Sequence, residues 1–489
     1  MDKSSDVFLN MRTPLLLTLL FASITVFGQG LGPTQTVHNE SSYGFARPVC
    51  GLNASGKVVV MWGKRNNQHV YVAVEGTSDF GTPVRLNPAG MTVFAQDWVG
   101  PDMAISGDNV HVSFKSQPEK EGFVYICSSS DGGKTFGDTV RVSDNNWSRF
   151  PAIATSPDGK NVYVAYMAFE ANFLEPHYVV CTSNDGGKTF GDEVKASLAP
   201  GEVCDCCPAD IFTTEDQVIV EFRNNDDDLR DMWAAISTDE GKSFKTVKDI
   251  DETDWEIGGC PSSGPTGIIG NDTLYSVWMS GADGPARIYL GTASKDSLEM
   301  GLNMMLTPAA TMSTTQNFPI IAGSGNKMGV VWQENVSGKG SIQFVYSKNG
   351  SSGVKPFNVI QIDDDVSGIP QNPYMWYDKA NNKFHVVWQN NQNHSVRYRS
   401  ISASLLSVPT QSEWKNFTLF PNPSSESFKI FGCVDCNVKV RTIDGLVVKE
   451  IGTYLANQDI DISNLHAGVY LVEVDEDGSR SITKFIITR

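Results

Sequence analysis

The chain carries arginines in segments between short apolar runs, where their side chains could meet a ligand. Five of them are candidates for binding an anion: Arg47, Arg149, Arg223, Arg230 and Arg287. A guanidinium pairs with a carboxylate through two parallel hydrogen bonds, and tryptophans such as Trp98 and Trp255 can stack on the apolar face of a sugar ring. The combination suits an anionic sugar. The plainer interpretation of any single residue is a polar loop side chain or a packed tryptophan.

A second chemical feature is a group of cysteines in two short segments, Cys204-Asp205-Cys206-Cys207-Pro208 and Gly259-Cys260-Pro261. C-x-C-C with one further cysteine could ligate a soft metal such as copper or zinc. If the chain is exported, as its N-terminus indicates, disulfide bonds are the plainer interpretation. We therefore predict that Cys204, Cys206, Cys207 and Cys260 form a disulfide-linked cluster, with a metal site as the alternative. The total of nine cysteines leaves at least one unpaired.

Charge restricts the partners of the protein. The net charge is −18 and the pI is about 4.8, which argues against a nucleic-acid partner because phosphate binding relies on Lys and Arg. An anionic ligand would need a local cluster of arginines. The acidic runs Asp226-Asp227-Asp228 and Asp363-Asp364-Asp365 could hold Ca²⁺, but solvated loops are the plainer interpretation. We expect no resident cofactor apart from that Ca²⁺ alternative.

The N-terminal segment, residues 1–28, has the pattern of a secretory signal peptide. Met11-Arg12 precedes the apolar run Leu15 to Phe27, and Val26-Phe27-Gly28 resembles a small-residue cleavage site. The apolar run is short for a transmembrane helix, and no other candidate span follows. We expect a mature chain without a transmembrane segment, secreted or attached to a surface.

The candidate residues belong to a unit that recurs at near-equal intervals along the chain. Each unit has a proline, a short apolar strand, a turn and a strand of the form V-x-V-x-aromatic. The prolines are Pro48, Pro101, Pro151, Pro208, Pro265, Pro319 and Pro373, and the second strands are Val58–Trp62, Val110–Phe114, Val162–Tyr166, Val218–Phe222, Leu274–Trp278, Met328–Trp332 and Phe384–Trp388. Units of four short strands at this spacing predict an all-β, seven-bladed β-propeller over residues 29–407, with six blades as the alternative.

The last unit has no evident fourth strand. The N-terminal segment Thr34-Gln35-Thr36-Val37-His38 resembles the fourth strand Asp138–Val142 of an earlier unit. We predict that this segment pairs with the strand Ser395–Ile401 and closes the ring, which removes an open sheet edge.

Three copies of one phrase identify a resemblance. Ser129-Ser130-Asp131-Gly132-Gly133-Lys134-Thr135-Phe136 recurs with one substitution as residues 183–190 and with three substitutions as residues 237–244. The pattern S-x-D-x-G-x-T-F resembles the Asp box of sialidases and related β-propellers. In this pattern the Asp carboxylate accepts hydrogen bonds from turn N–H groups and Gly supplies a positive φ. We expect the boxes to be fold elements on the face opposite the ligand site.

The sialidase resemblance assigns roles to individual residues. Phe45-Ala46-Arg47-Pro48 looks like a form of the F-R-I-P motif that carries the first arginine of a carboxylate-binding triad, and Ser148-Arg149-Phe150-Pro151 matches its wording two units later. The stretch Val218–Asn225 resembles the one that holds the second arginine, here Arg223, and Arg287 is placed like the third. The implied acid/base is Asp97 and the implied nucleophile is Tyr374.

One departure from sialidases concerns the nucleophile. A Glu-Pro pair commonly precedes the blade that carries the second arginine, and its Glu activates the tyrosine. Cys207-Pro208 stands at that place. A tyrosine without a base is a poor nucleophile near neutral pH, so retaining hydrolysis by this route is in doubt.

The C-terminal segment resembles a different family. Leu419-Phe420-Pro421-Asn422-Pro423, Asp461–Leu465 and Gly468–Val474 follow one another as in the C-terminal sorting domain of the type IX secretion system of Bacteroidetes. We predict such a domain over residues 415–489, folded as a small β-sandwich. The resemblance implies that the secretion machinery is a partner and that the protein reaches the cell surface or the medium.

These features lead to three hypotheses of function. The first is a secreted or cell-surface carbohydrate-active propeller of sialidase (neuraminidase) type, and any enzyme activity would be glycoside hydrolysis. The second is a non-catalytic propeller that binds glycans or proteins. The third is a cysteine-centred metal or redox site on the same face. Fold alone does not decide among them.

Overall fold

The computed structural model describes residues 30–488, apart from 309, 355–358, 365–367, 407–416, 432–435, 443–445, 456–457 and 477–478. The predicted signal peptide lies outside the described residues. The described part is almost entirely β-structure, with one short helix, α1 (Ala403–Leu406). No helix in this part of the chain is long and apolar enough to cross a membrane.

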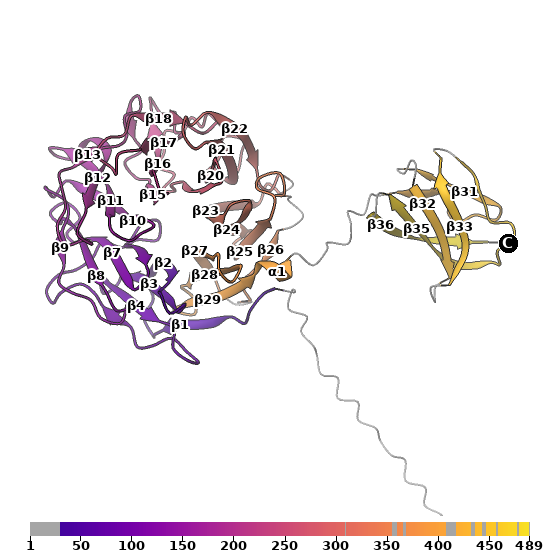
Figure 1. Ribbon diagram of the computed structural model, residues 1–489, viewed down its shortest axis with the longest axis horizontal. Coiled ribbons are helices and arrows are strands. Elements are labelled where there is room, and N and C mark those ends of the chain that lie inside the picture. The colour runs from indigo at the N-terminus through magenta and orange to yellow at the C-terminus, as the bar shows by residue number, and fades with distance from the viewer. Residues whose placement is uncertain are drawn as a thin grey trace, which may run out of the picture.

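Residues 30–402 contribute seven described sheets arranged in a ring (Figure 1). The first three sheets are β2 (Phe45–Leu52), β3 (Val58–Lys64), β4 (His69–Val74) and β5 (Val84–Arg85); β6 (Asp102–Ser106), β7 (Asn109–Lys115), β8 (Val124–Ser129) and β9 (Val140–Arg141); and β10 (Ser148–Thr155), β11 (Val162–Glu170), β12 (Leu174–Ser183) and β13 (Val194–Lys195). The next two are β14 (Glu202–Val203), β15 (Asp210–Thr213), β16 (Val218–Asn225), β17 (Met232–Ser237) and β18 (Thr246–Asp249); and β19 (Thr266–Gly270), β20 (Thr273–Ser280), β21 (Arg287–Ser294) and β22 (Met300–Met305). The last two are β23 (Thr314–Ser324), β24 (Lys327–Val336), β25 (Lys339–Ser347) and β26 (Ile360–Gln361); and β27 (Pro370–Asp378), β28 (Lys383–Asn390), β29 (Ser395–Ser402) and β1 (Gln35–Asn39).

The predicted second strands are the second strands of these sheets, and they are buried on both faces. In β3 every residue is buried. The aromatic residue that ends this pattern is fully buried in all seven sheets; these residues are Trp62, Phe114, Tyr166, Phe222, Trp278, Trp332 and Trp388. Each sheet packs both faces against its neighbours in the ring, so even polar residues of these strands, such as His111 and Ser113 of β7, are buried.

The ring is closed by the first strand of the chain. β1 pairs antiparallel with β29, with Gln35 opposite Tyr398 and Asn39 opposite Ser395. Neighbouring inner strands contact one another around the ring, and β2 contacts β27. The predicted closure by the N-terminal segment is therefore confirmed.

The Asp boxes form tight turns after the third strands. Asp131 accepts hydrogen bonds from the main-chain N–H groups of Lys134 and Thr135 at 3.0 and 2.9 Å and from the Thr135 hydroxyl at 2.6 Å. These donors hold the pKa of the Asp131 carboxyl well below its usual range. Gly133 has a φ of +86°. The boxes are thus satisfied turn elements, as expected.

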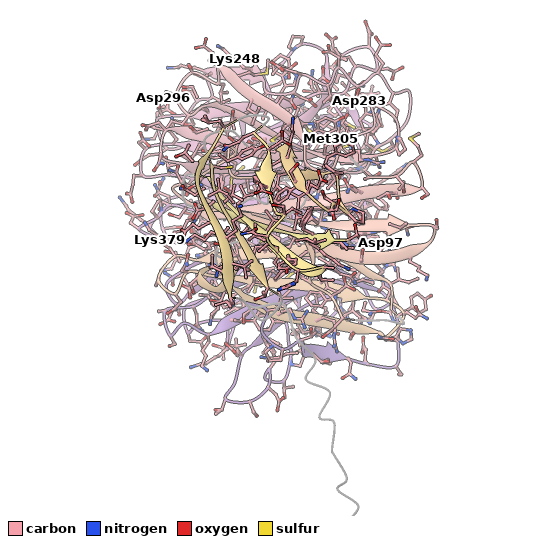
Figure 2. All side chains as sticks on the ribbon, turned by 90° about the vertical axis from the view of Figure 1, so that its right-hand side faces the viewer. Asp97, Lys248, Asp283, Asp296, Met305 and Lys379 are labelled. Atoms are coloured by element: carbon pink, nitrogen blue, oxygen red, sulfur yellow. A yellow bond between two sulfur atoms is a disulfide. The ribbon has the colours of Figure 1, made fainter. Side chains whose placement is uncertain are left out.

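The two faces of the ring are visible edge-on in Figure 2. Asp97 and Asp283, in loops that follow fourth and second strands, lie on the right, whereas Asp296 and Lys379 lie on the left. We call the face that carries Asp97 the mouth face. It also carries the cysteine segments and the seven prolines of the repeating unit, Pro48 to Pro373, which we call the register prolines.

The C-terminal domain is a two-sheet β-sandwich. Its strands are β30 (Thr418–Phe420), β31 (Ser427–Phe431), β32 (Cys436–Thr442), β33 (Val447–Tyr454), β34 (Ile460–Asp461), β35 (Gly468–Glu476) and β36 (Ser479–Ile487). One sheet has the order β30-β31-β34 and the other β33-β32-β35-β36. Buried side chains such as Phe428, Val440, Val472 and Phe485 fill the space between them.

Candidate functional site

The ring has a hollow at the centre of its mouth face. Five of the seven register prolines line it, together with Arg47, Trp98, Asp102, Asp210 and Tyr374. The enclosed space is about 80 Å³. This space takes a few waters or the end group of a larger ligand. We call it the mouth hollow.

The seven residues that precede the register prolines differ in type from sheet to sheet, and some of them line the mouth hollow. These residues are Arg47, Gly100, Phe150, Cys207, Gly264, Phe318 and Asn372. Arg47, Phe150, Phe318 and Asn372 adopt φ values between +47° and +52°, and each lies at a bulge in the pairing of the first and second strands. Residues other than glycine rarely adopt positive φ, and such strain gathers at functional sites.

Arg47 supplies a cation to the mouth hollow. Its guanidinium lies over the ring of Phe318 at 5.5 Å, and its main-chain N–H donates to Gln389 Oε1 at 3.0 Å. Among the described residues the guanidinium has no hydrogen-bond or ion-pair partner. Burial lowers the pKa of Arg47, and Asp102 acts in the opposite direction. A desolvated cation without a fixed partner is suited to receiving an anion.

Two carboxyls missed by the sequence analysis share the hollow. Asp102 Oδ2 accepts the N–H of Ile153 at 2.9 Å, and Asp210 Oδ2 accepts the N–H of Gly267 at 3.0 Å, so each carboxyl links the inner strands of neighbouring sheets. Burial raises the pKa of Asp102 to about 6 and that of Asp210 to about 7. The signal for both was a carboxylate just after a register proline, in a strand that is otherwise apolar.

Tyr374 lines the hollow beside these carboxyls. Burial raises the pKa of its phenol well above the usual value, and the charges of Asp102 and Asp210 raise it further. The phenol is therefore neutral at physiological pH and is a hydrogen-bond donor rather than a phenolate. Its predicted place at the ligand site is consistent with the structure, but its predicted nucleophilic role has no support from this electrostatic setting.

A third acid lies behind Asp210. Glu221, on β16, is fully buried and accepts a hydrogen bond from the Ser276 hydroxyl, while its Oε2 has no partner among the described residues. Burial raises its pKa well above the usual value, and Asp210 adds to the shift. A Cβ at Gly267 would lie 2.6 Å from the Glu221 carboxyl, so only glycine fits there.

Asp97 lies at the rim of the mouth face (Figure 2). Its Oδ2 accepts from Arg65 Nη1 at 2.7 Å, and its main-chain carbonyl accepts from Asn372 Nδ2 at 2.6 Å. It does not line the mouth hollow, although its neighbour Trp98 does.

The structure does not bring the three predicted triad arginines together. Arg223 is fully buried and donates to the carbonyls of Ser263, Arg230 and Met279. Arg287 is also buried, and it donates to main-chain carbonyls that include those of Thr314 and Thr311. Both guanidiniums are used to hold loops, so the expectation that they converge with Arg47 at the mouth is corrected.

The other two candidate arginines are also engaged. Arg149 pairs with Glu119 at 2.8 Å and lies over the rings of Phe169 and Phe173. Arg230 donates to the Ile257 carbonyl at 2.9 Å and to Cys204 Sγ at 3.0 Å. Neither lines the mouth hollow.

The cysteine segments meet on the wall of the mouth. Cys206 and Cys260 form a disulfide that links the loop before β15 to the loop before β19. Cys204 and Cys207 are free and buried, which corrects the expectation that all four cysteines are disulfide-bonded. Their Sγ atoms lie 3.1 Å apart. The hydrogen bond between the two sulfurs lowers the pKa of Cys204, with Arg230 contributing.

The described residues of the two acidic runs do not form a comparable cluster. Among the described residues, only Cys204, Cys206 and Cys207 place three ligand atoms within 4.8 Å of one another. In the first acidic run, Asp228 pairs with Arg230 at 3.5 Å. Asp365 of the second run lies outside the described residues.

Comparison with known proteins separates the two domains. The sequence profile of the secretion system C-terminal sorting domain matches residues 418–488. No curated protein matches the chain in sequence. Among solved structures, an ulvan lyase from a new polysaccharide lyase family is similar with a TM-score of 0.50 and 11% identity, over 76% of this chain and 96% of that one.

Two further solved structures are similar at lower scores. The sialidase of Trypanosoma rangeli has a TM-score of 0.43 and 11% identity, over 92% of this chain and 86% of that one. An α-L-arabinofuranosidase of Fusarium graminearum has a TM-score of 0.42 and 13% identity, over 66% and 95%. Residues 418–488 are therefore a type IX sorting domain, which directs secretion with release or surface attachment, and they follow a propeller that is similar in fold to the ulvan lyase.

Proposed function

We propose that the protein is a secreted, sialidase-like carbohydrate-active propeller that binds a carboxylate-bearing sugar at the mouth hollow. The observation that carries the proposal is the Arg47 guanidinium, which lines the hollow and has no partner among the described residues. Phe318 supports it from one side, and Trp98 offers an apolar surface for a sugar ring. The similar ulvan lyase fold is known bound to a glucuronate-containing sulfated disaccharide, which shows that such a fold can accommodate an anionic glycan.

The ligand would be recognised by one charged group and by neutral hydrogen-bond donors. Arg47 pairs with the ligand carboxylate, and the Tyr374 phenol donates a hydrogen bond to it or to a hydroxyl. Protonated Asp102 and Asp210 add neutral donors, whereas their ionised forms would repel the anion. This arrangement replaces the predicted three-arginine clamp with one arginine and three titratable hydroxyl donors.

Hydrolysis of the bound glycan is the more specific part of the proposal. Asp102 has a pKa of about 6, which is near the range that suits a general acid at mildly acidic pH. Asp210 follows shortly after Cys207, where the expected glutamate is missing, and its charge acts on Tyr374. Asp97 at the rim keeps its proposed acid/base role only if a ligand reaches from the hollow to the rim.

A non-catalytic glycan-binding role is the second candidate. Its support is that Arg223 and Arg287 are occupied by main-chain carbonyls and that the Tyr374 phenol is strongly held in its neutral form. A bound sugar would then be recognised but not cleaved.

The test is a glycan array with a release assay on the same purified full-length chain. Arg47→Met should lower affinity for acidic glycans by about 30-fold or more, since loss of a desolvated arginine pair costs about 2 kcal/mol or more. Arg85→Met is the matched control, because Arg85 is exposed on the outer strand β5. If no acidic glycan binds, or if both variants bind like wild type, the proposed function fails.

The release assay separates the two candidates. Free sugar that disappears in Asp102→Asn but persists in Arg85→Met supports hydrolysis. Binding without release by wild type supports the non-catalytic role.

A further inference from the structure

The sulfur atoms beside the mouth form a compact cluster that spans two sheets. Cys204 and Cys207 are buried, Cys206 is half-buried and Cys260 is exposed. The cluster therefore has a closed inner side and an outer side that solvent reaches. The proposed glycan site uses none of these sulfurs.

The three sulfurs on one loop lie close enough together to contact a single metal ion. Their Sγ–Sγ distances are 3.1 Å for Cys204–Cys207, 3.5 Å for Cys204–Cys206 and 3.9 Å for Cys206–Cys207. Zinc–thiolate bonds of about 2.3 Å require edges of about 3.8 Å in a tetrahedral site. A point about 2.3 Å from all three sulfurs lies roughly 1 Å out of their plane, close to the position of a tetrahedral ion above three ligands.

A candidate for a fourth ligand is Cys260, on the loop before the neighbouring sheet. Cys260 is held next to Cys206, with 6.2 Å between their Cα atoms. Once the bond between them is reduced, Cys260 offers a fourth sulfur to the same centre. We propose that Cys204, Cys206, Cys207 and Cys260 bind one thiophilic ion, Zn²⁺ or Cu⁺, when the Cys206–Cys260 disulfide is reduced.

The surroundings of the cluster favour a negatively charged metal–thiolate centre. Arg230 Nη1 donates to Cys204 Sγ at 3.0 Å, and Arg230 is itself oriented by the Ile257 carbonyl. A hydrogen bond from a cation to a ligating sulfur offsets the excess negative charge and fixes the ligand, as outer partners of metal ligands commonly do. Arg230 therefore acts on the cysteine cluster rather than in the glycan site.

The redox step balances with a two-electron reductant. A dithiol breaks the Cys206–Cys260 bond, supplies two electrons and two protons, and becomes a disulfide itself. The ion then displaces the protons of the ligating thiols. The oxidised and the metal-bound states both tie the loop before β15 to the loop before β19, so either state stabilises the same wall of the mouth.

The experiment uses the full-length chain under anaerobic conditions. Wild type is treated with a phosphine reductant, equilibrated with ZnCl₂ or with Cu⁺ buffered by a chelator, desalted, and analysed by native mass spectrometry and elemental analysis. We expect about one ion per reduced chain and almost none in the oxidised chain. The ion with the higher occupancy against the chelator identifies the preferred metal.

Three variants make the result specific. Cys204→Ser should bind at least about tenfold more weakly, whereas Cys127→Ser, which removes a buried thiol on β8, should bind like wild type. Cys260→Ser alters an exposed residue and frees Cys206, so it should take up the ion without reductant. This third variant decides the matter if Cys204→Ser does not fold.

Three outcomes would overturn the proposal. They are uptake of neither ion by reduced wild type, equal uptake by Cys204→Ser and wild type, and no uptake by unreduced Cys260→Ser. Glycan binding by the oxidised chain is expected in every case, so failure here is distinguishable from failure of the proposed function.

Discussion

The two faces of the propeller are made from one repeating unit but use it differently. On the Asp-box face the same residue types recur and make the same bonds: Asp131, Asp185 and Asp239 each accept from the hydroxyl of the Thr or Ser near the end of the box. On the mouth face, the position before the proline holds arginine, glycine, phenylalanine, cysteine or asparagine. The repeated positions build the ring, and the positions where the unit changes residue type bring different chemistry to one place.

Arg223→Met tests whether an arginine of the mouth face acts as part of the fold. Three main-chain carbonyls would lose their charged donor in a fully buried setting. At about 1–3 kcal/mol for each unsatisfied group, we expect a loss of about 4 kcal/mol in the free energy of unfolding. Urea unfolding measures it, and Arg85→Met is the control. An unchanged urea midpoint would show that Arg223 does not stabilise the fold and would make it a candidate ligand-binding residue again.

Gly264→Ala should have the next largest effect. A Cβ at this position would lie 1.8 Å from the Pro208 carbonyl oxygen, so two neighbouring sheets would have to separate. We expect a loss of about 3 kcal/mol by thermal or urea unfolding. Gly186→Ala in an Asp box meets nothing within 4 Å and incurs only the strain of its φ of +73°, about 1 kcal/mol. Equal losses would show that the mouth is no more tightly built than the Asp-box turns.

The pH dependence of ligand binding follows from the two raised carboxyl pKa values. Asp102 and Asp210 are largely neutral below their pKa values of about 6 and about 7 and are ionised above them. Binding of an acidic glycan should therefore strengthen by about tenfold as the pH falls from about 8 to about 5. Affinity measured in wild type and in the Asp102→Asn, Asp210→Asn double variant checks this, because the double variant should show a flat profile. A profile that rises with pH in wild type would contradict the placement of these carboxyls beside the ligand.

The same raised pKa values determine whether the free energy of unfolding rises or falls with pH. Both carboxyls have folded-state pKa values above their usual value of 3.8, because burial disfavours the ionised form. Their contribution to folding is fully present below about pH 4 and is lost as the pH rises through about 6 to 7. Urea midpoints of the ligand-free chain at pH 5 and pH 8 should move in this direction, and less so in the double variant.

Asp131→Ala should have the smallest effect. It removes the acceptor for four donors in a turn that water reaches, which we expect to cost about 1 kcal/mol in the free energy of unfolding. Glycan affinity should not change, because the box lies on the face away from the mouth. A loss of glycan affinity in this variant would contradict our conclusion that the Asp-box face serves the fold and the mouth face binds the ligand.

The architecture was accessible from the sequence because its signals are local and periodic. Register prolines, the buried second strands and the Asp boxes each depend on neighbours close by in the chain. The pairing of β1 with β29 was predicted from one missing strand and one spare segment, since a ring leaves a single place for it.

The site was less accessible because it depends on side-chain direction. Arg223 lies near the end of the strand β16 and its sequence resembles a triad position, but its guanidinium turns into the protein and meets carbonyls of two other segments. Asp102 and Asp210 lie in strands whose sequences are typical of a buried core. They share one hollow although β6 and β15 belong to different sheets, and their raised pKa values depend on how deeply the folded strands bury the two carboxyls.

The pairing of β1 with β29 also has a consequence for how the chain can become functional. The first strand of the propeller has no partner until the last one exists, so every shorter fragment is an open arc with an unpaired edge. The entropic cost of joining such distant segments grows only with the logarithm of their separation. Pairing of β1 with β29 is thus a late step with a small entropic cost, and it requires an intact chain. A molecule cut before Ser395 should remain a substrate for proteases, so the fold itself separates finished molecules from truncated ones.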